Sequence, residues 1–186
     1  MGKRKKIPKN GGIPSKSVKS GSPSNLVNNN LNASTTDVSI ELGMYPNWTH
    51  STRVGEFTNE FHNSDEALRY IYLTLDKLLP FIKQNGKEFI SQRLAHCHVL
   101  KKDQKDLAFE IIREIHSDTD ISEDSALWEL GYGQGVRLIA SVIYSDKVQI
   151  IPLFLDFHHL LYPSEKYNQN DYSKNACNLS PNELYK

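Results

Sequence analysis

The chain has 186 residues, of which 38% are hydrophobic, and this length favours one domain with an appendage. Its two cysteines, Cys97 and Cys177, are far apart and belong to no Cys-x-x-Cys pair, which excludes a disulfide framework. No apolar run reaches the roughly 18 residues of a membrane span, and the first residues lack the apolar part of a secretion signal. We therefore expect a cytoplasmic protein that does not cross a membrane.

Charge is divided unequally along the chain. Lys+Arg and Asp+Glu number 22 each, yet residues 1–36 contain seven bases and no acid. The rest of the chain is therefore left with 15 bases and 22 acids, a balance of −7. Residues 1–36 are also rich in Lys, Asn, Ser, Gly and Pro and poor in large apolar side chains. This composition predicts a disordered basic tail.

The densest basic stretch of the tail is a candidate nucleic-acid contact. Lysine and arginine bind a nucleic-acid backbone by releasing its counterions. A solubilising extension without a ligand is the alternative interpretation. The candidate residues are Lys3, Arg4, Lys5, Lys6 and Lys9.

The pattern after the tail predicts a short strand and then two helices. Val38, Ile40 and Leu42 alternate with polar residues, which is typical of a half-buried strand. From Ser64 apolar residues recur at spacings of three and four, so we predict a helix that turns this stripe toward a core. The stripe consists of Leu68, Ile71, Tyr72, Leu75, Leu78, Leu79 and Ile82. The second helix is predicted to begin at Asp103.

The second half of the domain changes to a strand period. Residues 126–131, 136–144 and 148–155 predict three strands of an antiparallel meander, and Pro152 favours an edge position or a bulge. We predict an α+β domain over residues 37–165, with two or three helices packed on a small antiparallel sheet (meander 126–155). Residues 166–186 are predicted to be a weakly ordered C-terminal tail.

The segment after the last predicted strand carries an Asp-x-x-His-x-x-Tyr pattern, formed by Asp156, His159 and Tyr162. Together with the lysine-rich residues 2–6 and the stretch 91–98, it resembles a small bacterial family known from mycoplasmas and mobile elements. Residues 126–163 are also similar to the sheet of RelE/HigB-type toxins, in which a Gly-Arg-x-x-hydrophobic strand pairs with its successor. That similarity implies a RelE/ParE-like fold, a metal-independent endoribonuclease acting on free or ribosome-associated mRNA, and a neutralising antitoxin.

Several side chains around this segment form a candidate catalytic site. A histidine near its ordinary pKa can take the proton from an RNA 2′-hydroxyl, and the planar guanidinium of Arg137 matches phosphate oxygens. The candidates are Arg137, Asp156, His158, His159 and Tyr162. The alternative is structural, with one of the two adjacent histidines packed inward and the other in solvent.

His96 and His98 are a weaker alternative, as zinc ligands. In an extended segment the two side chains point to the same face, and His with carboxylate ligands is ordinary for zinc. No standard ligand spacing supports this, so surface or half-buried histidines are the simpler interpretation. We expect no cofactor.

Two functions from different classes remain open. The first is a RelE-like toxin, an endoribonuclease with RNA or ribosome and antitoxin partners; the −7 balance of the domain speaks against it. The second is a non-catalytic binding or regulatory protein of a mobile element, whose basic tail contacts nucleic acid or an acidic partner. A cleft holding Arg137, Asp156 and a histidine favours the first, and burial of His158 and His159 favours the second.

Overall fold

The computed structural model describes residues 37–117, 120–133, 135–145, 147–163 and 177–184. They belong to one structural unit, Thr35–Lys186. The predicted basic tail, with the candidate nucleic-acid contacts Lys3, Arg4, Lys5, Lys6 and Lys9, lies outside the described residues. Its role stays a prediction.

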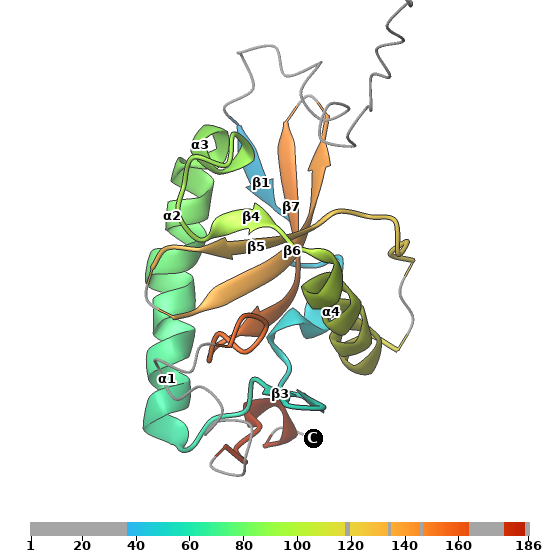
Figure 1. The fold of residues 1–186 in the computed structure, drawn as a ribbon. Helices are drawn as coiled ribbons and strands as arrows, with labels where there is room; N and C mark the ends of the chain where they lie inside the picture. Colours follow the sequence, from blue (N-terminus) through green and yellow to red (C-terminus); the bar gives the residue numbers. More distant parts are fainter. Residues whose placement is uncertain (1–36, 118–119, 134, 146, 164–176, 185–186) are drawn as a thin grey trace, which may run out of the picture. The chain divides into compact units, whose positions relative to one another are not determined.

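A five-stranded sheet forms the centre of the unit (Figure 1). Its strands are β1 (Val38–Ile40), β4 (Cys97–Val99), β5 (Leu127–Gly131), β6 (Arg137–Tyr144) and β7 (Val148–Asp156), in the order β1-β7-β6-β5-β4. β5, β6 and β7 pair antiparallel in succession, which confirms the predicted meander. β4 joins β5 antiparallel, and β1 runs parallel to β7. The α+β prediction is therefore confirmed, with a mostly antiparallel sheet larger than the meander alone.

Pro152 lies at a bulge. Ile139 and Ala140 are adjacent in β6, yet their partners in β7, Phe154 and Pro152, are separated by Leu153. β1 pairs with the part of β7 before this bulge, so no ladder bond to β1 is lost at the proline, which has no N–H. The sequence left an edge strand or a bulge open for Pro152, and the structure places it at a bulge in an interior strand.

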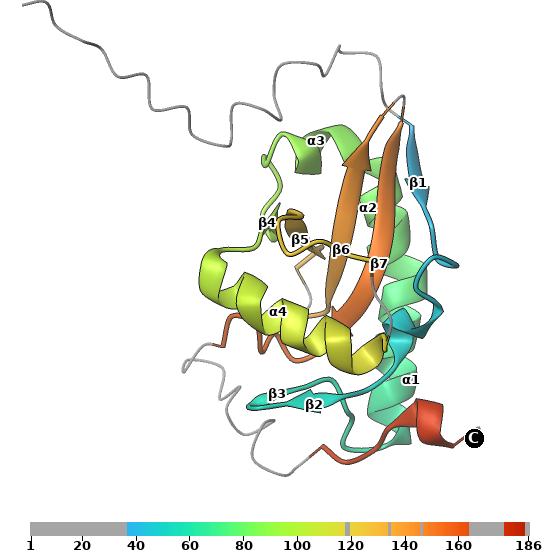
Figure 2. The same cartoon turned by 90° about the vertical axis from the view of Figure 1, so that its right-hand side faces the viewer.

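Helices cover both faces of the sheet (Figures 1 and 2). On one face α1 (Ser64–Leu73) continues through the π-helical turn η3 (Thr74–Leu78) into α2 (Leu79–Gln84), and α3 (Gly86–Ile90) follows. On the other face lies α4 (Lys102–Ile115). The cap of α1 is Asn63, whose side chain accepts a hydrogen bond from the backbone N–H of Glu66. In the described ranges, no helix combines the length and apolar character that crossing a membrane needs.

Each face of the sheet has its own apolar core, because successive strand residues point to opposite sides. In β6, Leu138 and Ala140 belong to the core on the side of Leu78 and Phe89, whereas Ile139 belongs to the core of α4. This two-sided burial is the reason why the meander strands consist almost entirely of apolar residues.

The prediction that the whole apolar stripe of the first helix faces a core is wrong. Ala67, Thr74 and Leu78 are buried, and of the predicted stripe only Leu78 and Ile82 are buried. Four stripe residues are exposed: Leu68 (61%), Ile71 (40%), Tyr72 (67%) and Leu75 (57%). The wider turn of η3 shifts the helix phase, so stripe residues before it point outward and those after it point inward.

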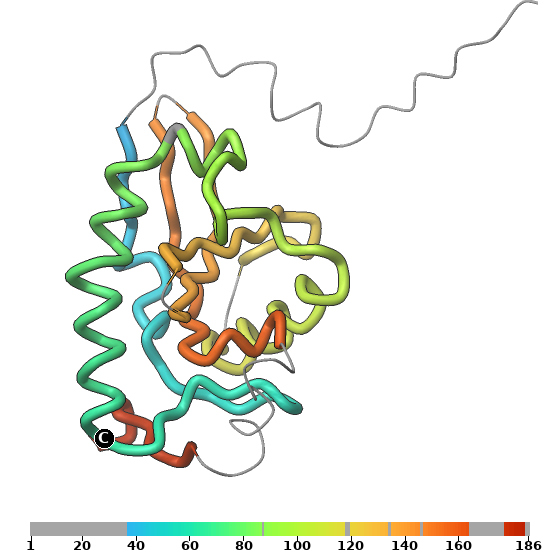
Figure 3. Tube along the Cα trace, turned by 60° about the vertical axis from the view of Figure 1, so that its left-hand side comes forward, coloured from blue at the N-terminus to red at the C-terminus, as the bar shows by residue number. Residues whose placement is uncertain are grey.

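Short segments cover the end of the sheet near α1. Residues 45–63, which the sequence pattern left open, hold the turn η2 (Pro46–Thr49) and the hairpin of β2 (Arg53–Val54) and β3 (Phe57–Thr58). Phe61 and Leu179 exchange backbone hydrogen bonds of 3.0 and 2.9 Å. Residues 177–184, ending in η6 (Pro181–Glu183), thus pack beside the start of α1 (Figure 3), within the range predicted as a weakly ordered tail.

Candidate functional site

Arg137 lies at the first position of β6, between the ends of two neighbouring strands. It pairs with Gly131 of β5 on one side and with Asp156 of β7 on the other. A Cβ atom on Gly131 would lie 2.6 Å from the Arg137 Cδ atom. Glycine at this position therefore gives the arginine side chain the space to lie flat across the sheet.

The guanidinium of Arg137 is buried and uses its donors inside the protein. The residue is 2% exposed. Its Nε donates to Glu129 Oε1 at 3.2 Å, and its terminal nitrogens contact the Val136 carbonyl at 3.0 Å and His96 Nδ1 at 3.3 Å. Because arginine only donates, His96 Nδ1 accepts and this imidazole is neutral.

Glu129 is a member of this group that the sequence analysis missed. It lies in the middle of β5, is 1% exposed, and its Oε2 has no hydrogen-bond partner among the described residues. Burial raises the pKa of its carboxyl to about 7, the nearby Asp156 raises it too, and Arg137 opposes both. One signal was available, since a single acid between apolar residues of an interior strand marks a buried charge.

Two histidines with left-handed backbone lie against Arg137. His96 has φ 64° and His159 has φ 60°, a conformation that costs free energy in residues other than glycine and often occurs at functional sites. Burial lowers the pKa of both imidazoles, and the charge of Arg137 lowers it further. Both effects favour the neutral form of the imidazole.

Asp156 holds the chain that follows β7. Its Oδ1 accepts the backbone N–H groups of His158 and Leu160 at 3.1 and 3.0 Å, and Oδ2 accepts that of Leu161 at 2.9 Å. The residue is fully buried. Its carboxylate thus shapes the turn that presents His159, and it is not open to a substrate.

Tyr162 and His98 border the same group. Their rings meet at a centroid distance of 5.4 Å, and Tyr162 also contacts the ring of His159 at 6.4 Å. The Tyr162 hydroxyl accepts the backbone N–H of Lys101 at 3.4 Å. Among the described residues, His96 and His98 do not join a third metal donor in one group.

His158 points elsewhere. It is buried, its Nε2 lies 2.6 Å from the Glu60 carbonyl, and its ring contacts Phe61, Tyr70 and His62. Of the two adjacent histidines, His158 is thus packed inward and His159 is half-buried, which is close to the structural alternative of one inward and one solvent-facing histidine.

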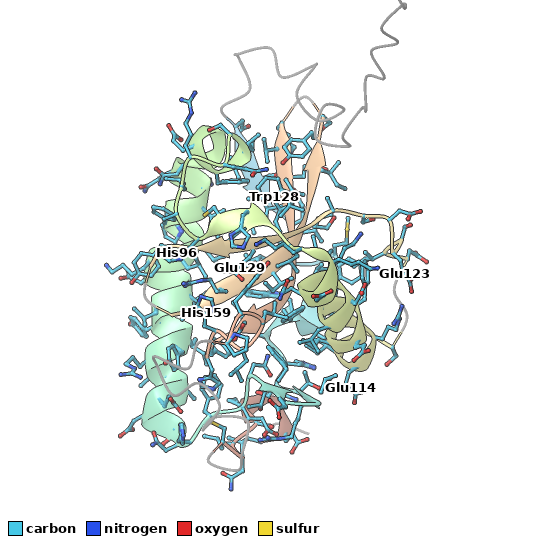
Figure 4. The ribbon with its side chains drawn as sticks, in the orientation of Figure 1. His96, Glu114, Glu123, Trp128, Glu129 and His159 are labelled. Carbon is cyan, nitrogen blue, oxygen red and sulfur yellow. The ribbon has the colours of Figure 1, made fainter. Side chains whose placement is uncertain are left out.

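The structure therefore brings Arg137, Asp156 and His159 together, adds Glu129 and His96, and separates His158. Figure 4 shows His96, Glu129 and His159 gathered over one part of the sheet. We call Glu129, Arg137, Asp156, His96 and His159 the charged cluster. Its two carboxylates and its arginine are buried, so only the histidines reach toward solvent.

A second candidate site is apolar. A cavity of about 450 Å³ lies between η2, α1, η3 and the C-terminal segment. Its lining residues are Trp48, Thr49, His50, Phe61, Ile71, Thr74, Leu75, Leu155, Phe157, Pro181 and Asn182. An apolar hollow with a few polar groups at its border is the usual form of a binding site.

Comparison with known proteins places these features in a family. Residues 44–183 match the family described as "Uncharacterised protein UU032". The chain is 33% identical over 157 residues to Uncharacterized protein UU032 of Ureaplasma parvum serovar 3 (strain ATCC 700970), which covers 82% of this chain and 86% of the relative. The chain belongs to the UU032 family. No solved structure is a significant match.

The UU032 match includes the charged cluster, every lining residue of the apolar cavity and residue 177, whereas residues 1–36 precede it. The Ureaplasma relative supports the mycoplasma part of the resemblance inferred from the sequence. Neither the similarity to RelE/HigB toxins nor a link to mobile elements finds support in these comparisons.

The raised pKa of Glu129 predicts a specific pH dependence of stability. Between pH 4.5 and about 7 the folded state holds a proton that the unfolded chain has released, so the free energy of unfolding falls as pH rises. The contribution across this window is about 3 kcal/mol. Glu129→Gln should remove this pH-dependent contribution to the free energy of unfolding. Urea unfolding at several pH values measures the difference.

The matched control is Glu114→Gln, the same change on the exposed side of α4. It should keep the wild-type pH profile. The ionisation assigned to Glu129 is wrong if the difference in unfolding free energy between wild type and Glu129→Gln is constant from pH 5 to 8.

Proposed function

We propose that this member of the UU032 family is a non-catalytic binding domain that holds an amphipathic helix of a partner protein against the outer face of α1. The observation that carries this proposal is the exposed apolar stripe of Leu68, Ile71, Tyr72 and Leu75. Single exposed apolar residues are ordinary, but four on one helical face form a patch of the kind that marks a protein-binding surface.

Two hollows border this stripe. Ile71 and Leu75 line the 450 Å³ cavity, and Leu75 also lines a hollow of about 300 Å³ with Ile40 and Leu79. A helical ridge between two grooves is the surface that a second helix packs against, with its own apolar side chains in the grooves. This geometry supports a helix as the occupant.

Charge favours a basic partner. The chain after residue 36 carries 15 bases and 22 acids. Complementary charge accelerates association and selects among partners. A partner helix with lysine or arginine beside its apolar face therefore fits, while the basic residues 1–36 add a contact to nucleic acid by counterion release.

The stripe can be tested with a displayed library of helical peptides that carry apolar residues at positions i, i+3, i+4 and i+7 and basic flanks. Peptides selected on the wild type should bind Leu75→Asp at least about 30-fold more weakly, as for a central interface residue. Titration by fluorescence anisotropy measures the affinities.

Ile143→Asp is the matched control, since Ile143 is exposed (44%) and lies on β6 away from both hollows. Selected peptides should bind it as they bind the wild type. A library that yields no binder, or binders indifferent to Leu75→Asp, overturns the proposal. If sedimentation shows that the wild type is a dimer and that Leu75→Asp is a monomer, the occupant of the stripe is a second copy of this chain instead.

A RelE-like endoribonuclease at the charged cluster is the second candidate. It is favoured by the left-handed backbone of His96 and His159, both beside Arg137. Neutral His159 can take the 2′-hydroxyl proton. Glu129, whose pKa is raised to about 7, could return one only after the cover over its buried carboxyl opened. Burial of Arg137 and the acidic balance of the domain weigh against it, because the arginine would have to leave Glu129 to reach a phosphate.

This candidate predicts that induced wild-type protein arrests growth and cleaves RNA, whereas His159→Ala does neither. His50→Ala, a histidine change outside the charged cluster, should behave as wild type. Intact RNA in all three strains, or equal toxicity of His159→Ala, removes the enzymatic candidate.

A further inference from the structure

We propose that His62, Glu66 and Cys177 bind one zinc ion, which fastens residues 177–184 to the start of α1. This site lies outside the charged cluster, and the proposal does not depend on a partner for the exposed stripe.

The three donors come from two distant parts of the chain. His62 and Glu66 flank the beginning of α1, one residue before its cap and within its first turn, and Cys177 opens the C-terminal segment. One donor atom from each lies within 4.8 Å of the other two. No other group of three such side chains meets this condition in the described part of the chain.

The distances around the sulfur suit a shared metal. Cys177 Sγ lies 3.5 Å from Nδ1 and 3.7 Å from Nε2 of His62. With Zn–S near 2.3 Å and Zn–N near 2.0–2.1 Å, a tetrahedral ion separates these ligand atoms by about 3.6 Å. His158 Nε2, at 3.8 Å from the sulfur, adds a further imidazole beside the group.

Glu66 and His62 now share a proton where the ion would lie. Glu66 Oε2 is 2.7 Å from His62 Nδ1 and also accepts the backbone N–H of His62 at 2.7 Å. The carboxylate thus holds the imidazole beside the sulfur. A metal ion that replaces the shared proton requires these two atoms to move apart to about 3.3 Å, the separation of ligand atoms around a tetrahedral ion with bonds of about 2.0 Å.

The donor set selects zinc. A thiolate with an imidazole and a carboxylate suits this borderline-soft ion, and three protein ligands leave one position for water. Cys177 is buried, whereas the His62 side chain is 34% exposed, so an ion can approach from the histidine side. The thiol loses its proton to solvent when the ion binds.

Zinc at this position would stabilise one wall of the apolar cavity. Beyond Cys177, the segment is held by the bridge between Phe61 and Leu179 and by the Asn182 side chain, which accepts the Ser51 N–H at 2.9 Å. Pro181 and Asn182 line the cavity. Arg53 already donates to the Cys177 carbonyl at 2.6 Å and Ser180 donates to Glu60 at 3.2 Å, so a metal link at Cys177 adds a side-chain anchor to these hydrogen bonds.

The test uses the full chain, stripped with a chelator and titrated with zinc alone against a chromophoric competitor. We expect one zinc per chain and, with cobalt in its place, the thiolate-to-metal band and the visible bands of a tetrahedral site. Cys177→Ser should weaken zinc binding at least about 100-fold, more than loss of an outer hydrogen bond to a ligand costs. Zinc should also slow proteolysis after residue 177.

Cys97→Ser is the matched control, because Cys97 is the other cysteine and lies in β4, where its thiol donates to the Gly131 carbonyl of β5. It should bind zinc as the wild type does. His62→Ala, at a partly exposed position, repeats the test should Cys177→Ser fail to fold. Zinc affinity equal in wild type, Cys177→Ser and His62→Ala, or cobalt without a thiolate band, overturns the proposal.

Discussion

The buried pair of Glu129 and Arg137 is the interaction on which the centre of the sheet depends. Removing two charges from water costs several kcal/mol per ion, which their attraction offsets only when further hydrogen bonds satisfy them. Arg137 has these bonds, to Val136 and His96, whereas Glu129 Oε2 has none among the described residues, and burial accordingly raises the pKa of Glu129 to about 7. Together with Asp156 the pair contributes one buried polar side chain from each meander strand, so a slip of register would leave a charge buried without its partner.

This arrangement has a consequence for function. An arginine that binds a substrate phosphate must turn donors toward it, but each of the three guanidinium nitrogens of Arg137 already has a partner inside the protein. A phosphate would have to displace Glu129, a competition that an acidic surrounding makes unfavourable. Along α1, by contrast, the described residues leave an apolar stripe exposed to solvent. These two facts are the reason why we propose a binding function ahead of a catalytic one.

The meander was predictable because short apolar runs bounded by turn residues mark strands, and so was the start of α1. The side to which the apolar stripe of α1 points was not predictable. It depends on the π-helical turn η3, which arises from packing and does not change the spacing of apolar residues in the sequence. His159 was found from its place after a strand, but the separation from His158 follows from a left-handed backbone that no residue-type rule indicates. Glu129 escaped because an acid in a strand normally faces solvent, and it marks a buried charge only once the strand is known to be interior.

The turn after β7 links the three sites physically. Asp156 fixes it through three backbone hydrogen bonds, and the residues it holds then diverge: Phe157 lines the apolar cavity, His158 lies beside Cys177, and His159 joins the charged cluster. Phe157 also packs on Phe61 at a ring distance of 4.7 Å, next to the bridge that holds the C-terminal segment. Phe157, His158 and His159 are therefore neighbours in one short turn, which the Asp156 carboxylate fixes through the backbone N–H groups of His158, Leu160 and Leu161.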